Sequence, residues 1–457
     1  MTTTLVAGVD CGTQSTKVVV CDAATGRVLR SGSAPHPDTT EVDPEIWWQA
    51  FREASGGLLD GVEAIAVGAQ QHGMVCLDSA DRVVRPAILW NDNRSAPDAA
   101  ELITELGGPD RWAEATGLVP VASFTVTKLR WLARNEPDNA ARTSTVLLPH
   151  DWLTWRLTGA FTTDRGDASG TGYWSPSTQD WRPDLLGLAL GREPGLPRVA
   201  SPAEIVGETP DGIRVAAGTG DNASAALGLG LRPGDAVVSI GTSGTVYAVA
   251  ERPTADPTGT VAGFADATGR HLPLVATLNA ARVLSATTNL LGRPIGDLAA
   301  LALAAPPGAG GIALLPYLDG ERTPNLPDAT GTLTGLTRAN MSPQNLARAA
   351  VEGMLCGLAD GLDALRELGV PVNRIRLIGG AAASPAVQEV AGTVFDVPVT
   401  VPAPAEYVAL GAARQAAWAL SGEAEPPAWA VEATDVEATT VKAVREGYRA
   451  AQAEVMG

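Results

Sequence analysis

Residues 8–22 read GVDCGTQSTKVVVCD, and this stretch decides the fold. An apolar run rich in β-branched residues ends in an acid and a Gly-Thr turn, and a second apolar run with one lysine follows. Two such runs around a Gly-containing turn are typical of a β-hairpin. The sequence therefore predicts two antiparallel strands, with Asp10 at the end of the first and with Gly12 and Thr13 in the turn.

A second stretch, about half a chain away, repeats this pattern. Residues 238–250 read VSIGTSGTVYAVA, so that Gly241 and Thr242 again stand between two apolar runs. Self-similarity of this kind indicates a repeated structural unit. We therefore expect two similar domains, each opened by a hairpin, over residues 1–230 and 231–457.

The remaining pattern alternates between strand and helix. Apolar residues recur at helical spacing in residues 45–59 and 345–369, and residues 62–70 form a short apolar run typical of a buried strand. Alternating strands and helices favour an α/β architecture. A further helix is expected within residues 433–455, packed on the second domain.

Composition narrows the class of protein. The 457 residues are 45% hydrophobic with a net charge of −18, which repels nucleic acid and anionic lipid. The four cysteines form no CxxC pair and the four histidines no HxxxH pattern, so neither a disulfide framework nor a His-rich metal site is expected. Because the start has no basic region before an apolar run, and no run is long enough to span a membrane, we expect a cytoplasmic protein.

The two hairpin turns suit phosphate binding. Backbone N–H groups and a Thr hydroxyl in a tight turn are donors for phosphate oxygens. Lys17 would add a positive charge, and Asp10, an acid beside phosphates, makes sense if Mg²⁺ lies between them. The alternative is a pair of ordinary hairpins with a surface acid.

Two further Gly-rich turns each precede a helical pattern. In residues 218–230, GTGDNASAALGLG, the carboxylate of Asp221 is placed either to accept a proton from a substrate hydroxyl or to cap the helix. In residues 377–385, LIGGAAASP, small side chains leave room for a flat ring or ribose, and the helix start at Ser384 is a candidate nucleotide contact. Close helix–strand packing explains the second turn equally well.

Polar and aromatic residues gather in two neighbouring loops, QQHGMV and ILWNDNRS. Such a mixture suits a polyol, because hydroxyl groups need both donors and acceptors. A satisfied core histidine and a core tryptophan remain the alternatives for two of them. The residues concerned are Gln71, His72, Trp90, Asn91, Asp92 and Arg94.

The order of these motifs resembles the FGGY carbohydrate kinases from about residue 6 to about residue 417. The resemblance rests on GVDCGTQSTKVVV, QQHGMV, ILWNDNRS, GTGDNASAALGLG, SIGTSG, LPYLDGERTP, LIGGAAASP and GAARQAA. It implies two actin-like (ribonuclease-H-like) domains with ATP in the cleft between them. It also implies Mg²⁺- and ATP-dependent phosphorylation of a ketopentose, with D-xylulose expected and ribulose, a pentitol or glycerol kept open.

The resemblance also implies roles for single residues. Asp221 corresponds to the family's proton acceptor and Asp10 to the acid needed for Mg²⁺-ATP. This chain departs from the family pattern at Ala381, where a third glycine is usual, and at Gln71, where a methionine is common. The expected contacts are Gln71, His72, Asn91 and Asn222 for the sugar, and Gly12, Thr13, Gln14, Lys17, Gly241, Thr242, Gly379, Gly380, Ala381 and Ser384 for ATP.

Twin phosphate hairpins also occur in actin-like ATPases that have no sugar substrate. Such a protein would hydrolyse ATP without sugar, whereas the polar loops at residues 71–94 favour a kinase. The expected partners are therefore a small-molecule sugar and ATP, with no nucleic acid and no membrane. A homodimer stays open.

Overall fold

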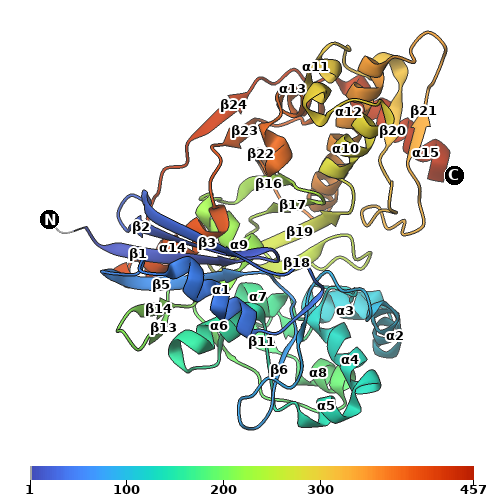
Figure 1. Ribbon diagram of the computed structural model, residues 1–457. Helices are drawn as coiled ribbons and strands as arrows, with labels where there is room; N and C mark the ends of the chain where they lie inside the picture. The colour runs from blue at the N-terminus through green and yellow to red at the C-terminus, as the bar shows by residue number, and fades with distance from the viewer. Residues whose placement is uncertain (1–2, 457) are drawn as a thin grey trace. The chain divides into compact units, whose positions relative to one another are not determined.

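The computed structural model describes residues 3–456, which fall into two compact units (Figure 1). The first unit comprises Met1–Leu231, Glu251–Leu272 and Ala405–Val431. The second comprises Arg232–Ala250, Pro273–Pro404 and Glu432–Gly457. The chain therefore leaves the first unit and returns to it twice.

The first unit is built on a mixed sheet with the order β13-β14-β5-β1-β2-β3. The predicted hairpin is confirmed: β1 and β2 are antiparallel, and Asp10 faces Lys17 across the pair. β5 and β14 extend the sheet in parallel, and β15 also pairs with β5. The bounds are β1 Leu5–Cys11, β2 Ser15–Asp22, β3 Val28–Pro35, β5 Val62–Ala69, β13 Ile205–Glu208, β14 Arg214–Ala216 and β15 Thr219–Gly220.

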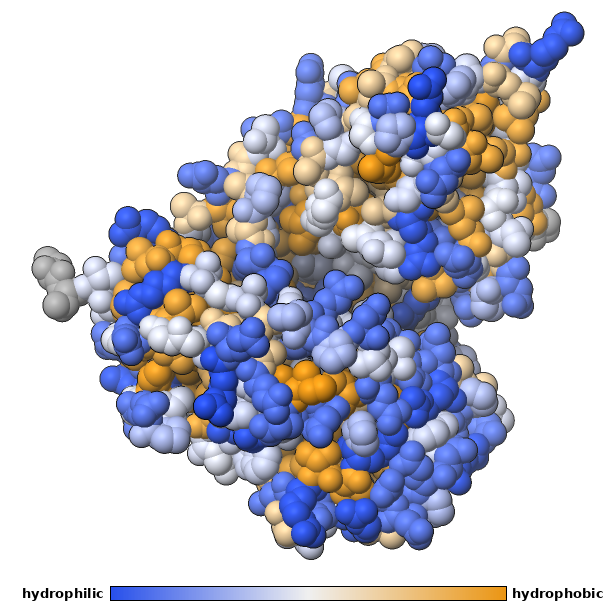
Figure 2. All heavy atoms as spheres, in the orientation of Figure 1, coloured by the Kyte–Doolittle hydropathy of each residue, from blue (hydrophilic) through white to orange (hydrophobic). Residues whose placement is uncertain are grey.

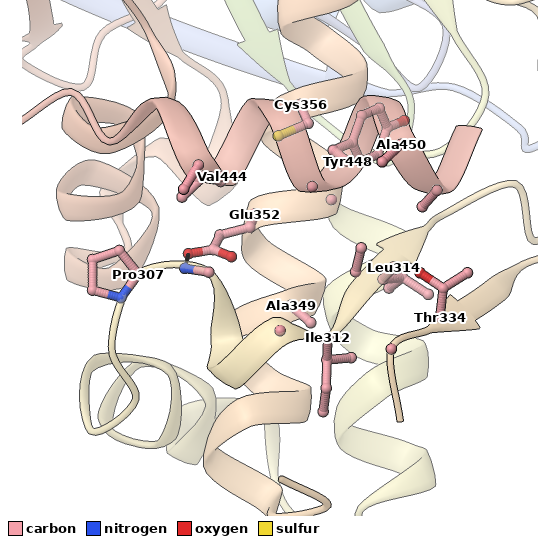
Figure 3. A pocket seen from close by; sticks show the side chains of 18 of the residues that line it. Pro307, Ile312, Leu314, Thr334, Ala349, Glu352, Cys356, Val444, Tyr448 and Ala450 are labelled. Atoms are coloured by element: carbon pink, nitrogen blue, oxygen red, sulfur yellow. Dashed lines mark hydrogen bonds between the residues drawn. The ribbon is translucent and has the colours of Figure 1, made fainter. Parts of the chain in front are cut away.

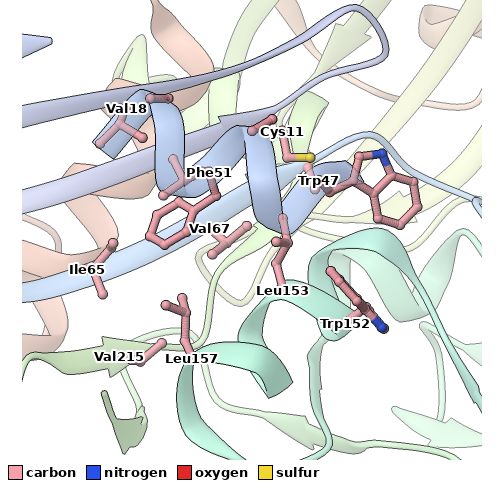
Figure 4. Close-up of a cluster of buried hydrophobic side chains, with 14 of the residues drawn as sticks. Cys11, Val18, Trp47, Phe51, Ile65, Val67, Trp152, Leu153, Leu157 and Val215 are labelled. Carbon is pink, nitrogen blue, oxygen red and sulfur yellow. The ribbon is translucent and has the colours of Figure 1, made fainter. Parts of the chain in front are cut away.

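Helices cover both faces of this sheet. On one face, α1 (Glu45–Ser55) and α6 (Pro149–Thr158) bury Trp47, Phe51 and Trp152 against the strands (Figure 4). On the other face, the alanine-rich α14 lies so close that a Cβ atom on Gly8 would come within 1.9 Å of the Ala409 carbonyl oxygen. The other helices of this unit are α2 Ala96–Leu106, α3 Pro109–Thr116, α4 Thr125–Asn135, α5 Pro137–Arg142, α7 Arg165–Ser169, α8 Pro183–Leu190, α9 Asp221–Gly228 and α14 Tyr407–Ser421.

The second unit repeats the strand order as β19-β17-β16-β22-β23-β24. The long α12 and the C-terminal α15 both belong to this unit, and α15 packs against α12, α13 and β20, as the sequence predicted. The helix expected over residues 433–455 is wrong at its start, because residues 433–436 form β24, which pairs with β23, and the helix begins only at Lys442. The strands are β16 Gly234–Ile240, β17 Gly244–Ala248, β19 His271–Thr277, β20 Ala313–Leu315, β22 Val372–Ile378, β23 Val399–Pro402 and β24 Ala433–Val436. The helices are α10 Ala281–Leu290, α11 Leu298–Leu303, α12 Pro343–Glu367, α13 Pro385–Val394 and α15 Lys442–Met456.

Six strands in each sheet share one topology, and the two sheets also share an irregularity. In each, an antiparallel meander opens the sheet and its first strand then pairs in parallel with a later strand. The parallel register shifts between Leu5 and Val6 in one unit and between Gly234 and Asp235 in the other. The predicted duplication is therefore confirmed.

Part of the surface of the first unit is rich in hydrophilic side chains. On the face shown in Figure 2, hydrophilic side chains predominate over the region of the first unit that holds α2 and α4. Among residues 3–456, no helix combines the length and the apolar character that crossing a bilayer requires.

Candidate active site

Two carboxylates interact in the first unit, one at the end of β1 and one at the start of α9. Burial, followed by the nearby charge of Asp221, raises the pKa of Asp10 to about 7. Lys17 opposes this rise, but its ammonium group is paired with Glu406 at 2.6 Å. Asp221, predicted from a separate motif, therefore lies close enough to Asp10 to raise its pKa.

The first turn is held by side chains from three other segments. The Gly12 carbonyl oxygen accepts hydrogen bonds from Gln70 (3.1 Å) and His36 (3.1 Å). The indole N–H of Trp90 donates to the Thr13 hydroxyl at 2.9 Å, which joins two of the predicted motifs. These three hydrogen bonds therefore fix the position of the turn that carries the candidate phosphate contacts.

The two predicted phosphate turns use their glycine amides internally. The Gly12 N–H donates to the Ser15 carbonyl at 3.0 Å, and the Gly241 N–H donates to the Ser243 carbonyl at 3.1 Å. Within residues 3–456, the Thr13 and Gln14 amides donate to no other group. The backbone donors of the first turn are therefore Thr13 and Gln14 rather than Gly12.

Asp221 is held by the residue that follows it. Its Oδ1 accepts hydrogen bonds from the backbone N–H (2.7 Å) and the side-chain amide (3.0 Å) of Asn222. Its Oδ2 accepts none from the residues that the structure describes. Burial raises the pKa of Asp221 to about 6, against these hydrogen bonds. Gly220, not Asp221, occupies the N-cap of α9, so the capping alternative is wrong.

Gln71 and Asn222 come together beside this carboxylate. The Asn222 side-chain amide donates to the Gln71 Oε1 at 3.3 Å. Gly220 makes room for this pair, because a Cβ atom there would lie 2.7 Å from the Gln71 side chain. Two of the four predicted sugar contacts therefore flank Asp221.

His72 has a left-handed backbone with φ of 68°, which a non-glycine residue adopts only when its surroundings enforce it. Thr125 and the buried Lys128 both donate to its carbonyl oxygen at 3.2 Å. Its ring packs against Phe124 and lies with Nδ1 2.9 Å from the Gly170 carbonyl oxygen. Because a carbonyl oxygen only accepts, Nδ1 carries a hydrogen.

In the polar loop at residues 88–95, some side chains have hydrogen-bond partners within the protein and others do not. The buried Asp92 accepts hydrogen bonds from Thr40 and Arg94 and so has a structural role. The Asn91 Oδ1 is buried and accepts no hydrogen bond from the described residues. A buried acceptor without a partner is costly, so Asn91 remains a candidate ligand contact whereas Asp92 does not.

The Gly-rich turn at residues 377–385, in the second unit, combines close packing at one glycine with open space at the next. A Cβ atom on Gly379 would lie 2.6 Å from the Ile240 carbonyl oxygen, and its φ of 92° favours glycine, so this residue serves close packing. A Cβ atom on Gly380 would meet nothing within 4 Å. Ala381 lies in the short helix that follows, and Ser384 is the N-cap of α13 without a side-chain cap hydrogen bond.

The sequence prediction missed a fully buried polar cluster, which we call the His150 cluster: His150, Asp151, Asp164 and Asp167. His150 Nε2 lies 2.8 Å from the Ala217 carbonyl oxygen, and Nδ1 lies 3.1 Å from Asp151. Asp164 accepts the Thr219 hydroxyl at 2.7 Å. No spacing motif signals this cluster, because its members come together only through tertiary packing.

The cluster holds a proton on His150. Ala217 offers only an acceptor to Nε2 and the Asp151 carboxylate faces Nδ1, so both ring nitrogens need hydrogens. Hydrogen bonding and attraction by Asp151, with Asp167 and Asp164 adding to the attraction, outweigh burial and raise the pKa of His150 to about 9. Burial raises the pKa of Asp167 well above its ordinary range, and neither of its oxygens accepts a hydrogen bond from residues 3–456, although Oδ2 lies 3.7 Å from His150 Nδ1.

We expect the stability advantage of the wild type over His150→Gln to shrink as pH rises from 6.5 to 9. The folded-state pKa of about 9 exceeds the ordinary 6.5, so the stabilisation is complete below pH 6.5 and is lost as pH rises through 9. The difference between the two proteins in the free energy of unfolding, measured by urea denaturation, should shrink by roughly 1 kcal/mol per pH unit. His271→Gln is the control, because burial lowers its pKa to about 4. A constant difference would contradict the buried imidazolium.

A separate cavity of about 460 Å³ lies in the second unit, between α12, α15 and the loop before β20 (Figure 3). Its buried Glu352 accepts a hydrogen bond from the Gly308 N–H at 2.9 Å. None of the predicted site residues lines this cavity. It therefore plays no part in the site described above.

Two family models and several proteins of known name match this chain over most of its length. Residues 5–228 match the N-terminal domain, and residues 236–420 the C-terminal domain, of the FGGY family of carbohydrate kinases. The chain is 52% identical over 436 residues to a xylulose kinase of Streptomyces rubiginosus and 50% identical over 435 residues to one of Streptomyces coelicolor, in both cases covering 92% of this chain and 89% of the relative. The crystal structure of xylulose kinase from Bifidobacterium adolescentis superimposes with a TM-score of 0.94 at 47% identity, covering 98% of this chain and 99% of that one.

Proposed function

Because this chain belongs to the FGGY family of carbohydrate kinases, we propose that it transfers the terminal phosphoryl group of ATP to D-xylulose, giving D-xylulose 5-phosphate and ADP. Relatives named xylulose kinase, about half identical over most of the chain, support this sugar. The observation that carries the proposal is the Asp221 carboxylate, which has one oxygen without a partner among the described residues, beside Gln71 and Asn222.

Asp221 is the general base. Its Oδ2 accepts the proton of the substrate hydroxyl as the hydroxyl oxygen attacks phosphorus, while Asn222 holds Oδ1 and so fixes the carboxylate plane. A pKa near 6 leaves the group ionised at neutral pH yet more basic than an ordinary aspartate. Asp221 is therefore deprotonated at neutral pH and still basic enough to take up the hydroxyl proton.

The sugar contacts are Gln71, His72, Asn91 and Asn222. Amide and imidazole groups both donate and accept, as a ligand covered in hydroxyl groups requires. The Asn91 Oδ1, buried without a partner in the part of the chain that the structure describes, would accept from a sugar hydroxyl.

The nucleotide contacts are spread over three turns. Asp10, a hard oxygen ligand beside the phosphate turn, is the residue that would hold Mg²⁺; the ion, when bound, would offset the charge of the phosphate oxygens. Open space above Gly380 fits a ring or ribose lying on the backbone. The remaining contacts are Thr13, Gln14, Lys17, Thr242, Ala381 and Ser384, while Gly12, Gly241 and Gly379 shape the turns that carry them.

A coupled assay of ADP release tests the proposal. The purified chain with MgATP is mixed with D-xylulose, ribulose, a pentitol, glycerol or no sugar. We expect release that depends on sugar and is fastest with D-xylulose. Faster turnover with another acceptor would revise the substrate, whereas equal release without any sugar would replace the kinase with an actin-like ATPase.

Three coarser features complete the proposal. We place the two family domains over residues 1–230 and 231–457, in line with the matched ranges 5–228 and 236–420, although residues 251–272 and 405–431 lie in the first compact unit. We take the cytoplasm as the compartment and leave a homodimer open. Light scattering behind size exclusion measures the oligomeric state directly.

A further inference from the structure

The segment that leads into Asp221, residues 217–220, is fixed on two sides. On one side, β15 pairs with β5, with Thr219 opposite Gly68. On the other side lies the His150 cluster. This segment links the end of β14 to Asp221, the first residue of α9, so its position determines the position of Asp221.

Two side chains of the cluster hold this segment. The His150 Nε2–H donates to the Ala217 carbonyl oxygen (2.8 Å), and the Thr219 hydroxyl donates to the Asp164 Oδ2 (2.7 Å). All four residues are buried, three of them completely, so water does not compete for these hydrogen bonds. Neither His150 nor Asp164 belongs to the candidate contacts with substrate.

The packing around these contacts leaves no room for side chains at two glycines. Gly218 has φ of 72°, and a Cβ atom there would lie 2.3 Å from His150 Nε2 and 2.5 Å from the Val67 carbonyl oxygen. A Cβ atom on Gly166 would lie 2.6 Å from the Thr219 hydroxyl. The cluster and the segment are therefore in direct contact over several residues.

Asp164 is itself held in place. Its two oxygens accept the backbone N–H groups of Gly166 (2.8 Å) and Asp167 (2.9 Å), and the carboxylate caps α7. A carboxylate that already has two backbone donors is a rigid acceptor for a third group. The Thr219 hydroxyl therefore binds to a point that is fixed before the substrate arrives.

We propose that His150 and Asp164 are positioning residues for the general base, acting through Ala217 and Thr219 to set the place of Asp221. The proposal rests on the proposed function. Catalytic groups lose efficiency when they are displaced by about 1 Å, so a loosened segment lowers the rate of the chemical step more than it weakens sugar binding.

The test compares Thr219→Val with Thr219→Ser in the sugar-dependent ADP assay. Valine keeps the shape and removes the hydroxyl, whereas serine keeps the hydroxyl. We expect kcat to fall about tenfold or more in Thr219→Val, with KM for D-xylulose within threefold, and both constants within threefold of wild type in Thr219→Ser. An unchanged kcat in a folded Thr219→Val protein overturns the positioning role.

A double variant separates positioning from general damage. If Thr219 acts through Asp221, Thr219→Val should cause no further loss in an Asp221→Asn background. An equal loss in both backgrounds would mean that the hydroxyl serves the fold alone. A wild type inactive with every acceptor removes the kinase proposal itself, so the two failures are distinguishable.

A second pair of variants covers the case in which Thr219→Val does not fold. His150→Gln keeps an N–H donor at the place of Nε2, and His150→Leu removes it. We expect a near wild-type kcat in the glutamine variant and a loss of about tenfold in the leucine variant. Equal kcat in the two variants would exclude a role for the hydrogen bond to Ala217.

Discussion

Replacing Asp221 by asparagine is expected to lower kcat for sugar-dependent ADP release by about 10²- to 10⁴-fold. An amide cannot take up the hydroxyl proton at neutral pH, but its oxygen still accepts the hydrogen bonds that Asn222 gives to Oδ1. The local fold should therefore survive. Rates measured at saturating ATP and sugar, beside a thermal denaturation curve, separate the loss of chemistry from the loss of structure.

The matched control is Asp211→Asn, which removes an exposed carboxylate from the same unit. This variant lowers the negative charge by the same amount and should keep wild-type kcat. If Asp221→Asn turned over at the wild-type rate while remaining folded, another group would have to take the proton.

The hairpins could be predicted because their signal is local. Residues 8–22 and 238–250 each combine β-branched runs with a Gly-Thr turn, and strand alternation and turn chemistry act over a few residues. The position of Asp221 could be predicted for the same reason, since a Gly-rich turn before a helix is visible in the sequence. That Asn222 fixes one oxygen of Asp221 required the structure.

The His150 cluster could not be predicted because polar sequences are normally exposed. Asp164 lies beside Arg165 and Asp167 in the sequence, whereas the stretch around His150 is mostly apolar apart from Asp151 and Arg156, and charged residues rarely lie in a core. They are buried here because each finds a backbone or hydroxyl partner in the segment before Asp221. The return of α14 to the first unit is also absent from the pattern, because an alanine-rich helix fits either sheet.

Replacing Gly411 by alanine is expected to destabilise the first unit by about 3 kcal/mol. A Cβ atom on Gly411 would lie 1.7 Å from the Ser224 carbonyl oxygen on α9, far below the 3.0 Å that real Cβ contacts keep. A Cβ atom on Gly228, on the same face of α9, would lie 2.2 Å from the Tyr407 carbonyl oxygen. The two backbones must separate by more than about 1 Å, and interiors are too densely packed to absorb such a shift.

Gly187→Ala, in helix α8 of the same unit, is the matched control, because a Cβ atom there meets nothing within 4 Å. Alanine at such a place should stabilise by about 0.5–1 kcal/mol, since it lowers the entropy of the unfolded chain. The comparison is made by urea denaturation. Because Asp221 is the first residue of α9, the displacement in Gly411→Ala should also lower kcat in the protein that remains folded. Equal stability of the two variants would show that α9 and α14 adjust freely, and would then remove this packing as a reason for the placement of the base.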